Sequence, residues 1–83
     1  MGRADGPPAP PLNLVADYGG GAMMMALGIV SGILEAKSSG EGQVIDVSMV
    51  EGASLMMSLY HSLDKAELWS RERAGNFLDG RAP

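Results

Sequence analysis

The chain has 83 residues, a formal net charge of −4 and no cysteine. The missing cysteines exclude disulfides and thiolate metal sites, and ten acidic against six basic residues argue against a nucleic-acid partner. Glycine (12) and methionine (7) are abundant, whereas Phe and Trp occur once each, so the apolar residues specify a core weakly. We therefore expect residues 1–83 to be a partial segment of a larger domain rather than a complete independent one.

Residues 2–11 contain four prolines, which fix the backbone and predict an extended loop. This N-terminus lacks the apolar stretch of a signal peptide. The longest apolar stretch, Ala22–Leu34, is shorter than the roughly 20 residues that a membrane span needs, and extending it backwards includes Asp17. We therefore expect a soluble, cytoplasmic protein with no membrane span.

A first helix is predicted over residues 17–37, because its middle is a long run of helix-compatible apolar residues. It is apolar on every side, which is typical of a helix at the centre of a large assembly. Gly28 and Gly32 lie one turn apart and would allow another element to pack very close. Gly40 is the predicted C-terminal stop.

A short strand is predicted over residues 44–48, where β-branched residues dominate. Ser48 and Glu51 then have the spacing of a capping box, which predicts a second helix over residues 49–63. Residues 64–83 are expected to be mostly irregular, with one short helical turn near 65–70.

The predicted order is loop, helix, strand, helix and tail. A lone strand has no partner within these 83 residues, although its backbone donors and acceptors must be paired. The natural folding unit is therefore expected to be larger, or to assemble with other chains.

Asp17, followed by Gly19, Gly20 and Gly21, is the main candidate site. Free N–H groups at a helix start favour negative charge, and glycines let backbone donors approach a ligand closely. Such a place suits a carboxylate that moves a proton beside a developing enolate. Acids are also common in first turns for stability alone, and the spacing by itself favours this structural interpretation.

His61 is the only histidine and falls near the end of the second predicted helix, where we interpret it as a partly exposed residue rather than a base. With one histidine and no cysteine, no metal site is expected. Glu51 has a sufficient role as a helix cap, and Asp46 needs no catalytic explanation.

Three blocks resemble a known family: PLNLVADYGGGAM at residues 11–23, GEGQVIDVSMVEG at 40–52, and RAGNFLDG at 73–80, which follows Leu68-Trp69. In this order they are similar to the family III CoA-transferase (CaiB/BaiF) superfamily. The last block points to its α-methylacyl-CoA racemase branch rather than to formyl-CoA or carnitine CoA-transferases. The resemblance covers roughly residues 6–83.

The resemblance implies an α/β fold in which two chains interlock like linked rings as a homodimer. Racemases of this type epimerise C2 of 2-methylacyl-CoA thioesters through an enolate, with a histidine on one face and an aspartate on the other. Asp17 matches that aspartate. The coenzyme A thioester is the substrate, no prosthetic group is implied, and the backbone at Gly19, Gly20 and Gly21 is a candidate for ligand contacts.

The departures from the family pattern matter equally. The family's catalytic histidine would lie upstream and a supporting glutamate downstream, so neither matches a residue here, and His61 does not replace the histidine. Arg81 stands where the family has a second glycine. We therefore expect an internal segment of the enzyme that is inactive by itself.

Two alternatives remain. The first is a CoA-transferase in which Asp17 attacks the thioester and carries an acyl anhydride. The second is a small non-catalytic helical protein that associates through its methionine- and glycine-rich surface.

Overall fold

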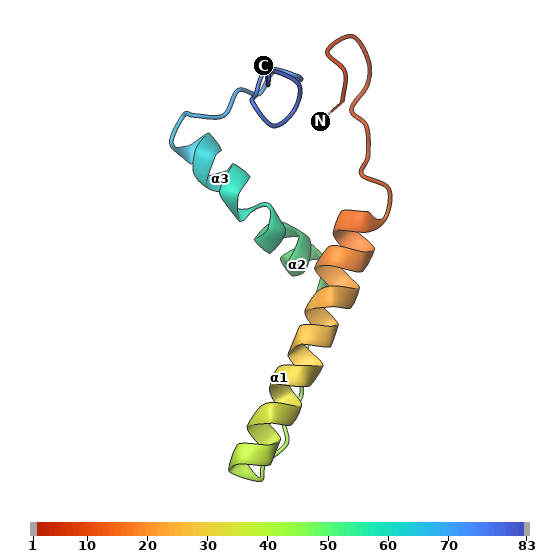
Figure 1. The fold of residues 1–83 in the computed structure, drawn as a ribbon, viewed down its shortest axis with the longest axis vertical. Coiled ribbons are helices and arrows are strands. Elements are labelled where there is room, and N and C mark those ends of the chain that lie inside the picture. The colour runs from red at the N-terminus through yellow and green to blue at the C-terminus, as the bar shows by residue number, and fades with distance from the viewer. Residues whose placement is uncertain (1, 83) are drawn as a thin grey trace. The chain divides into compact units, whose positions relative to one another are not determined.

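The computed structural model describes residues 2–82 of the chain, and their secondary structure is helical (Figure 1). The described residues form two compact units, a helical unit (residues 13–56) and a terminal unit (residues 2–12 with 57–82). The elements in chain order are η1 (Leu14–Met23), α1 (Met24–Ser39), α2 (Met49–Met56) and α3 (Ser58–Lys65).

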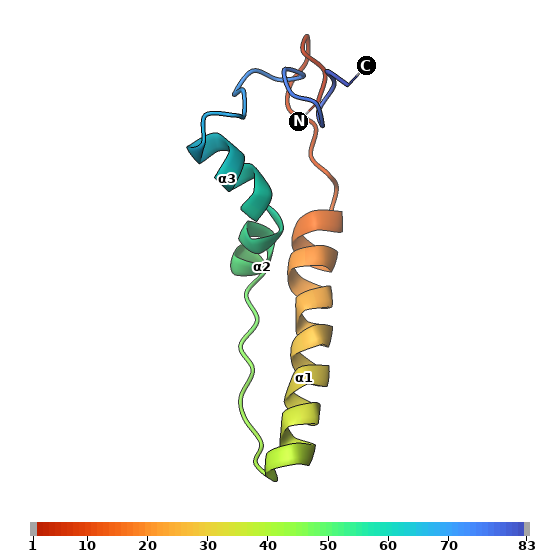
Figure 2. The ribbon, with the colours of Figure 1, turned by 60° about the vertical axis from the view of Figure 1, so that its left-hand side comes forward.

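The first predicted helix is confirmed, but it is longer than expected and starts in a different register. Its first ten residues, η1, form a π-helix, which begins where Tyr18 N–H donates to the Asn13 carbonyl at 3.1 Å, five residues back. The helix continues without interruption into α1 (Figure 2). Gly40 ends it in the left-handed conformation (φ 78°) and donates its N–H to the Ala36 carbonyl at 2.8 Å, as predicted.

Together η1 and α1 make one helical stretch of 26 residues, Leu14–Ser39, with a mean hydropathy of 1.4 over its most apolar window. By length and composition alone this stretch is comparable to a bilayer-spanning helix, and it exceeds the apolar run seen in the sequence. The core helix of a soluble protein meets the same criteria. One helix of this kind, with Asp17 in its first turn, does not amount to a membrane span.

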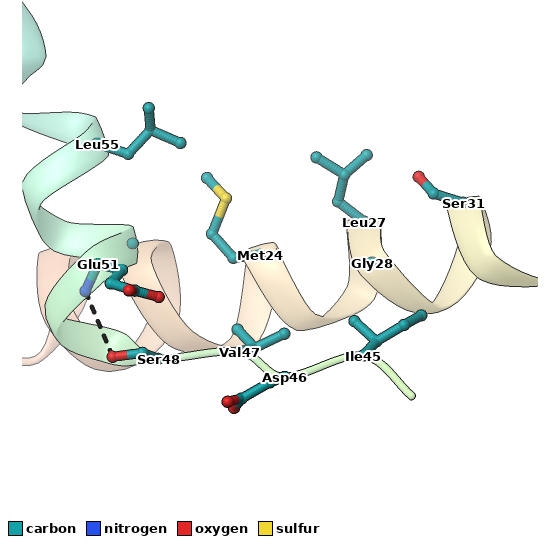
Figure 3. Close-up of a pocket in the computed structure, with 11 residues that line it drawn as sticks. Met24, Leu27, Gly28, Ser31, Ile45, Asp46, Val47, Ser48, Glu51 and Leu55 are labelled. Atoms are coloured by element: carbon teal, nitrogen blue, oxygen red, sulfur yellow. Dashed lines mark hydrogen bonds between the residues drawn. The ribbon is translucent and has the colours of Figure 1, made fainter. Parts of the chain in front are cut away.

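The predicted strand at residues 44–48 is wrong for this structure, because no strand is formed anywhere within residues 2–82. The segment is nevertheless extended and runs back alongside α1 (Figures 1 and 2). Ile45 and Val47 face α1, whereas Asp46 points away (Figure 3). The alternation of a strand is therefore present, but no second strand supplies the hydrogen bonds, and the described residues are helical rather than α/β.

Ile45 occupies the space that two glycines of α1 leave open. A Cβ added to Gly28 would lie 2.9 Å from Ile45 Cγ2, and one added to Gly32 would lie 2.5 Å from Ile45 Cδ1. This bears out the expectation that these glycines, one helical turn apart, permit close packing. The extended segment can approach the helix only because both positions lack a side chain.

The helix α2 begins at Met49, directly after its predicted cap. Glu51 N–H donates to Ser48 Oγ at 3.4 Å, which is one half of the capping box (Figure 3). The predicted helix over 49–63 is wrong in one respect: it is divided at Met57, whose φ of −88° and ψ of 6° interrupt the helical backbone. α3 follows and continues to Lys65, two residues beyond the predicted end.

The interior of the helical unit is formed by backbone atoms at glycines rather than by large side chains. Within residues 2–82 no hydrophobic side chain is buried, and the buried positions of the helices are glycines: Gly20, Gly21 and Gly52. A Cβ added to Gly52 would collide with the Gly20 carbonyl, and one added to Gly20 would lie 2.6 Å from the Ala53 nitrogen. η1 and α2 therefore touch backbone to backbone.

The terminal unit is organised around Asn76, whose side chain is 7% exposed. Its amide accepts from Ser70 N–H and donates to the Ser70 carbonyl, both at 2.8 Å. Asn76 N–H donates to Asp79 Oδ1 at 2.7 Å, and the Asn76 carbonyl accepts from Arg81 N–H at 2.9 Å. These bonds fold residues 70–81 into a closed loop, which we call the Asn76 loop. The chain after Lys65 is otherwise irregular, as predicted.

Two side-chain pairs lie before and at the start of this loop. Tyr60 and Trp69 meet edge to face with ring centroids 5.1 Å apart. Arg71 makes a two-pronged ion pair with Asp64, with Nε to Oδ1 at 3.1 Å and Nη2 to Oδ2 at 2.9 Å. Both members of the ion pair are solvent-accessible, so it orients the chain more than it stabilises it.

Candidate active site

Asp17 lies in the first turn of η1, and its side chain is exposed. Because the first i→i−5 hydrogen bond is made by Tyr18 N–H, the N–H groups of residues 14–17 precede the helical ladder. These groups give the helix start a partial positive charge, which favours a carboxylate there. Asp17 is thus an accessible carboxylate at the positive end of the helix.

Gly19, Gly20 and Gly21 lie along the contact with α2. A Cβ on Gly19 would meet the Met56 sulfur at 2.7 Å, and one on Gly21 would meet Met49 Cγ at 2.9 Å. In a π-helix their N–H groups are directed towards carbonyls five residues earlier. The absence of side chains at these positions therefore serves helix packing, while the expected backbone contacts with a ligand stay a prediction.

A shallow groove of about 420 Å³ lies elsewhere in the helical unit, between α1, the extended segment and α2 (Figure 3). Apolar side chains such as Met24, Leu27 and Leu55 line it, together with Ser31 and Glu51. Asp17 is not among its lining residues. The structure therefore does not bring the predicted catalytic residue to this groove.

His61 lies in α3 of the terminal unit and is exposed, as the sequence predicted. The two hydrogen bonds from Arg71 hold the pKa of Asp64 below its ordinary value, and the charge of His61 adds a smaller effect in the same direction. Across residues 2–82 no cluster of three or more His, Asp or Glu side chains has the geometry to hold a metal ion.

The Asn76 loop was missed by the sequence interpretation, which treated residues 64–83 as mostly irregular. The available signal was Asn76 three residues before Asp79, because Asn and Asp side chains often cap turns by bonding nearby backbone groups. Within this loop Arg73 Nη1 is buried and makes no hydrogen bond to any described residue. The block that resembles the racemase branch is thus a hydrogen-bonded loop rather than an unstructured tail.

The chain was compared with known proteins. Residues 1–83 match the family described as CoA-transferase family III. The chain is 49% identical over 83 residues to α-methylacyl-CoA racemase of Mus musculus and 45% identical to that of Homo sapiens. A CaiB/baiF CoA-transferase family protein of Caenorhabditis elegans, ZK892.4, is 36% identical over 78 residues.

These matches cover nearly all of this chain but only part of each relative. The two racemases match 100% of the chain and the nematode protein 92%, whereas the matched region is 22% of each relative. The chain therefore spans about a fifth of the length of the relatives it matches.

Proposed function

The chain belongs to CoA-transferase family III, and from this membership we propose that it is the aspartate-bearing segment of an α-methylacyl-CoA racemase. The observation that carries the proposal is the 49% identity to the mouse racemase over all 83 residues. The nematode CoA-transferase family protein is less similar, at 36%.

The proposed reaction is epimerisation at C2 of a 2-methylacyl-CoA thioester. The Asp17 carboxylate removes the C2 proton, and the electron pair of the C–H bond moves into the thioester to form an enolate. A histidine outside these 83 residues returns a proton to the opposite face, and the roles reverse for the other enantiomer. The exposed position of Asp17 in the first turn of η1 supports this role.

The wider architecture follows as part of the same proposal. The complete enzyme is an interlocked cytoplasmic homodimer of α/β fold, in which residues 44–48 gain a partner strand. Coenzyme A thioesters are its substrates. Within residues 2–82, 21 large hydrophobic side chains are exposed, among them Leu27 and Val30 of α1, and they support such a covering by further protein.

A CoA-transferase is the alternative, and the name of the nematode relative favours it. In that reaction the Asp17 carboxylate would attack the thioester carbonyl, expel coenzyme A as a thiolate and form an aspartyl-acyl anhydride. The thiolate would then attack the Asp17 carbonyl of this anhydride, which releases the first carboxylic acid and leaves coenzyme A as a thioester on Asp17. A second carboxylate would attack that thioester, expel the thiolate and form a new anhydride, and the thiolate would attack the second acid's carbonyl to give its coenzyme A thioester and free Asp17. The two reactions differ in whether the C2–H bond breaks.

The test replaces the matching 83 residues of the mouse racemase with this chain and incubates the graft in D₂O. The substrate is a 2-methylacyl-CoA of one configuration, together with a free carboxylic acid. We expect deuterium at C2 with loss of chirality, and Asp17→Asn should slow it about a thousandfold because the general base is removed. Asp46→Asn is the matched control, since Asp46 points away from α1 (Figure 3).

Transfer of coenzyme A to the added acid without deuterium at C2 would refute the racemase and support the transferase. Deuterium entry that survives Asp17→Asn would refute the role given to Asp17.

A further inference from the structure

Among the glycines of the helical unit, Gly52 in α2 leaves the least room for a side chain, because it packs on Gly20 in η1. A Cβ on Gly52 would meet three backbone atoms of Gly20, namely its carbonyl oxygen, its carbonyl carbon at 2.6 Å and its Cα at 2.8 Å. From the other side, a Cβ on Gly20 would meet the Ala53 nitrogen at 2.6 Å and the Met49 carbonyl at 3.1 Å. Both glycines are buried.

This contact cannot adjust locally. The other closely packed glycines of the unit meet side-chain atoms first, as Gly19 meets the Met56 sulfur and Gly32 meets Ile45 Cδ1. At the Gly52 contact, backbone meets backbone, so an added methyl group can be accommodated only if one whole helix moves. The separation of η1 and α2 is therefore set by the absence of a side chain at position 52.

Asp17 lies in the turn of η1 that this contact holds. It precedes Gly20 by three residues, and a turn of a π-helix contains more than four. A shift of η1 away from α2 therefore carries the Asp17 carboxylate with it. Displacement of a reacting group by about 1 Å can cost a hundredfold in rate, because the reacting atoms leave their near-attack geometry.

We propose that Gly52 is a positioning residue, which sets the place of the Asp17 carboxylate relative to the bound thioester through its contact with Gly20. This inference rests on the proposed racemase function. It assigns Gly52 no contact with the substrate.

The test compares proton removal from the two enantiomers of the substrate, in the mouse racemase that carries this chain in place of its matching 83 residues. Asp17 removes the C2 proton of one enantiomer, and the histidine of the host enzyme removes that of the other. In D₂O with each pure enantiomer, Gly52→Ala should slow proton removal from the Asp17-dependent enantiomer by ten- to a hundredfold, mainly in kcat. Removal from the other enantiomer should change by less than threefold. General loss of structure would slow both equally, and that result would overturn the proposal.

Two further variants keep the test decisive. Gly6→Ala is the matched control, because its Cβ would have no neighbour within 4 Å and it should leave both rates unchanged. Met49→Ala introduces no clash and removes a half-exposed side chain that packs on Gly21, so it should fold and give a smaller loss for the same enantiomer. Equal rates for both enantiomers in Met49→Ala would count against the proposal if Gly52→Ala fails to assemble.

Amide hydrogen exchange on the same samples separates this inference from the proposed function. Gly52→Ala should speed exchange of the η1 amides, Leu14–Met23, at least fivefold relative to Gly6→Ala. Unchanged exchange would overturn the positioning role whatever the activity. A folded graft that moves neither enantiomer's proton, yet shows the expected exchange, would refute the racemase function and leave the Gly52 contact supported.

Discussion

Replacing Asn76 by alanine would loosen the Asn76 loop, because its side-chain amide holds Ser70, at the start of the loop, against the middle of the loop. The amide accepts from Ser70 N–H and donates to the Ser70 carbonyl, both at 2.8 Å. Each such bond contributes about 1 kcal/mol net, so Asn76→Ala should weaken loop closure by about 2 kcal/mol. That energy corresponds to roughly a thirtyfold increase in the open population.

Amide hydrogen exchange at Arg81 is a suitable measurement. Arg81 N–H donates at 2.9 Å to the backbone carbonyl of residue 76, which the alanine variant keeps. A change in its exchange rate therefore reports opening of the loop and not deletion of the bond itself. We expect Arg81 to exchange about thirty times faster in Asn76→Ala.

Phe77→Ala is the control for this experiment, since Phe77 is next to Asn76 but is 68% exposed. It should change the Arg81 exchange rate by less than threefold. An Arg81 rate in Asn76→Ala that matches wild type would show that the backbone turn closes the loop without the side chain, and would refute this account.

Two other predictions concern the same unit. Arg71 lowers the pKa of Asp64, so the ion pair should persist at neutral pH and be lost only as the pH falls below the ordinary value of 3.8. Arg71→Gln should return the pKa of Asp64 towards that value. Carbon-detected NMR titrations of Asp64 that are identical in the wild type and in Arg71→Gln would contradict this prediction. Ala74 has a left-handed backbone (φ 56°), which costs a non-glycine residue about 1–2 kcal/mol. Ala74→Gly removes this strain but costs about 0.5–1 kcal/mol in extra chain entropy. Amide exchange of Gly75 N–H, which is bonded to the Glu72 carbonyl, should therefore slow about threefold. Faster exchange in the variant would refute the prediction.

The sequence predicted the features that depend on local chemistry. The long first helix, its stop at Gly40 and the cap at Ser48 are all present, because left-handed glycine and a serine hydroxyl act on their immediate neighbours. The family was recognised from three short blocks, and the match over residues 1–83 confirms it.

What the sequence did not predict depends on contacts between distant residues. The π-helical register of η1 accompanies the approach of Gly20 to Gly52, 32 positions later, and no local pattern reports such a contact. The strand at residues 44–48 failed for the opposite reason, because its composition was suitable but a partner strand is absent from residues 2–82. No glycine or proline lies at Met57, so the sequence carries no signal for the break in the helix there.

For the candidate site, the sequence identified Asp17 and its helix start, and the structure gives that carboxylate an exposed position in the first turn of η1. All three glycines pack against α2, a role that the sequence did not indicate, and their expected backbone contacts with a ligand stay a prediction. The Asn76 loop required reading Asn76 and Asp79 together with Ser70, whose bonded partner lies six residues away.

The packing of Ile45 against Gly28 and Gly32 also has an evolutionary consequence. Because one side chain fills the space that two missing side chains leave, the three positions share a single volume. A lineage that gains a methyl group at position 32 keeps this packing if position 45 becomes valine, which lacks Cδ1, whereas a methyl group at position 28 requires the loss of Cγ2 as well, for example to alanine. Substitutions at these positions should therefore arise as compensated pairs, and an enlarged position 45 should be found only where both helix positions are still glycine.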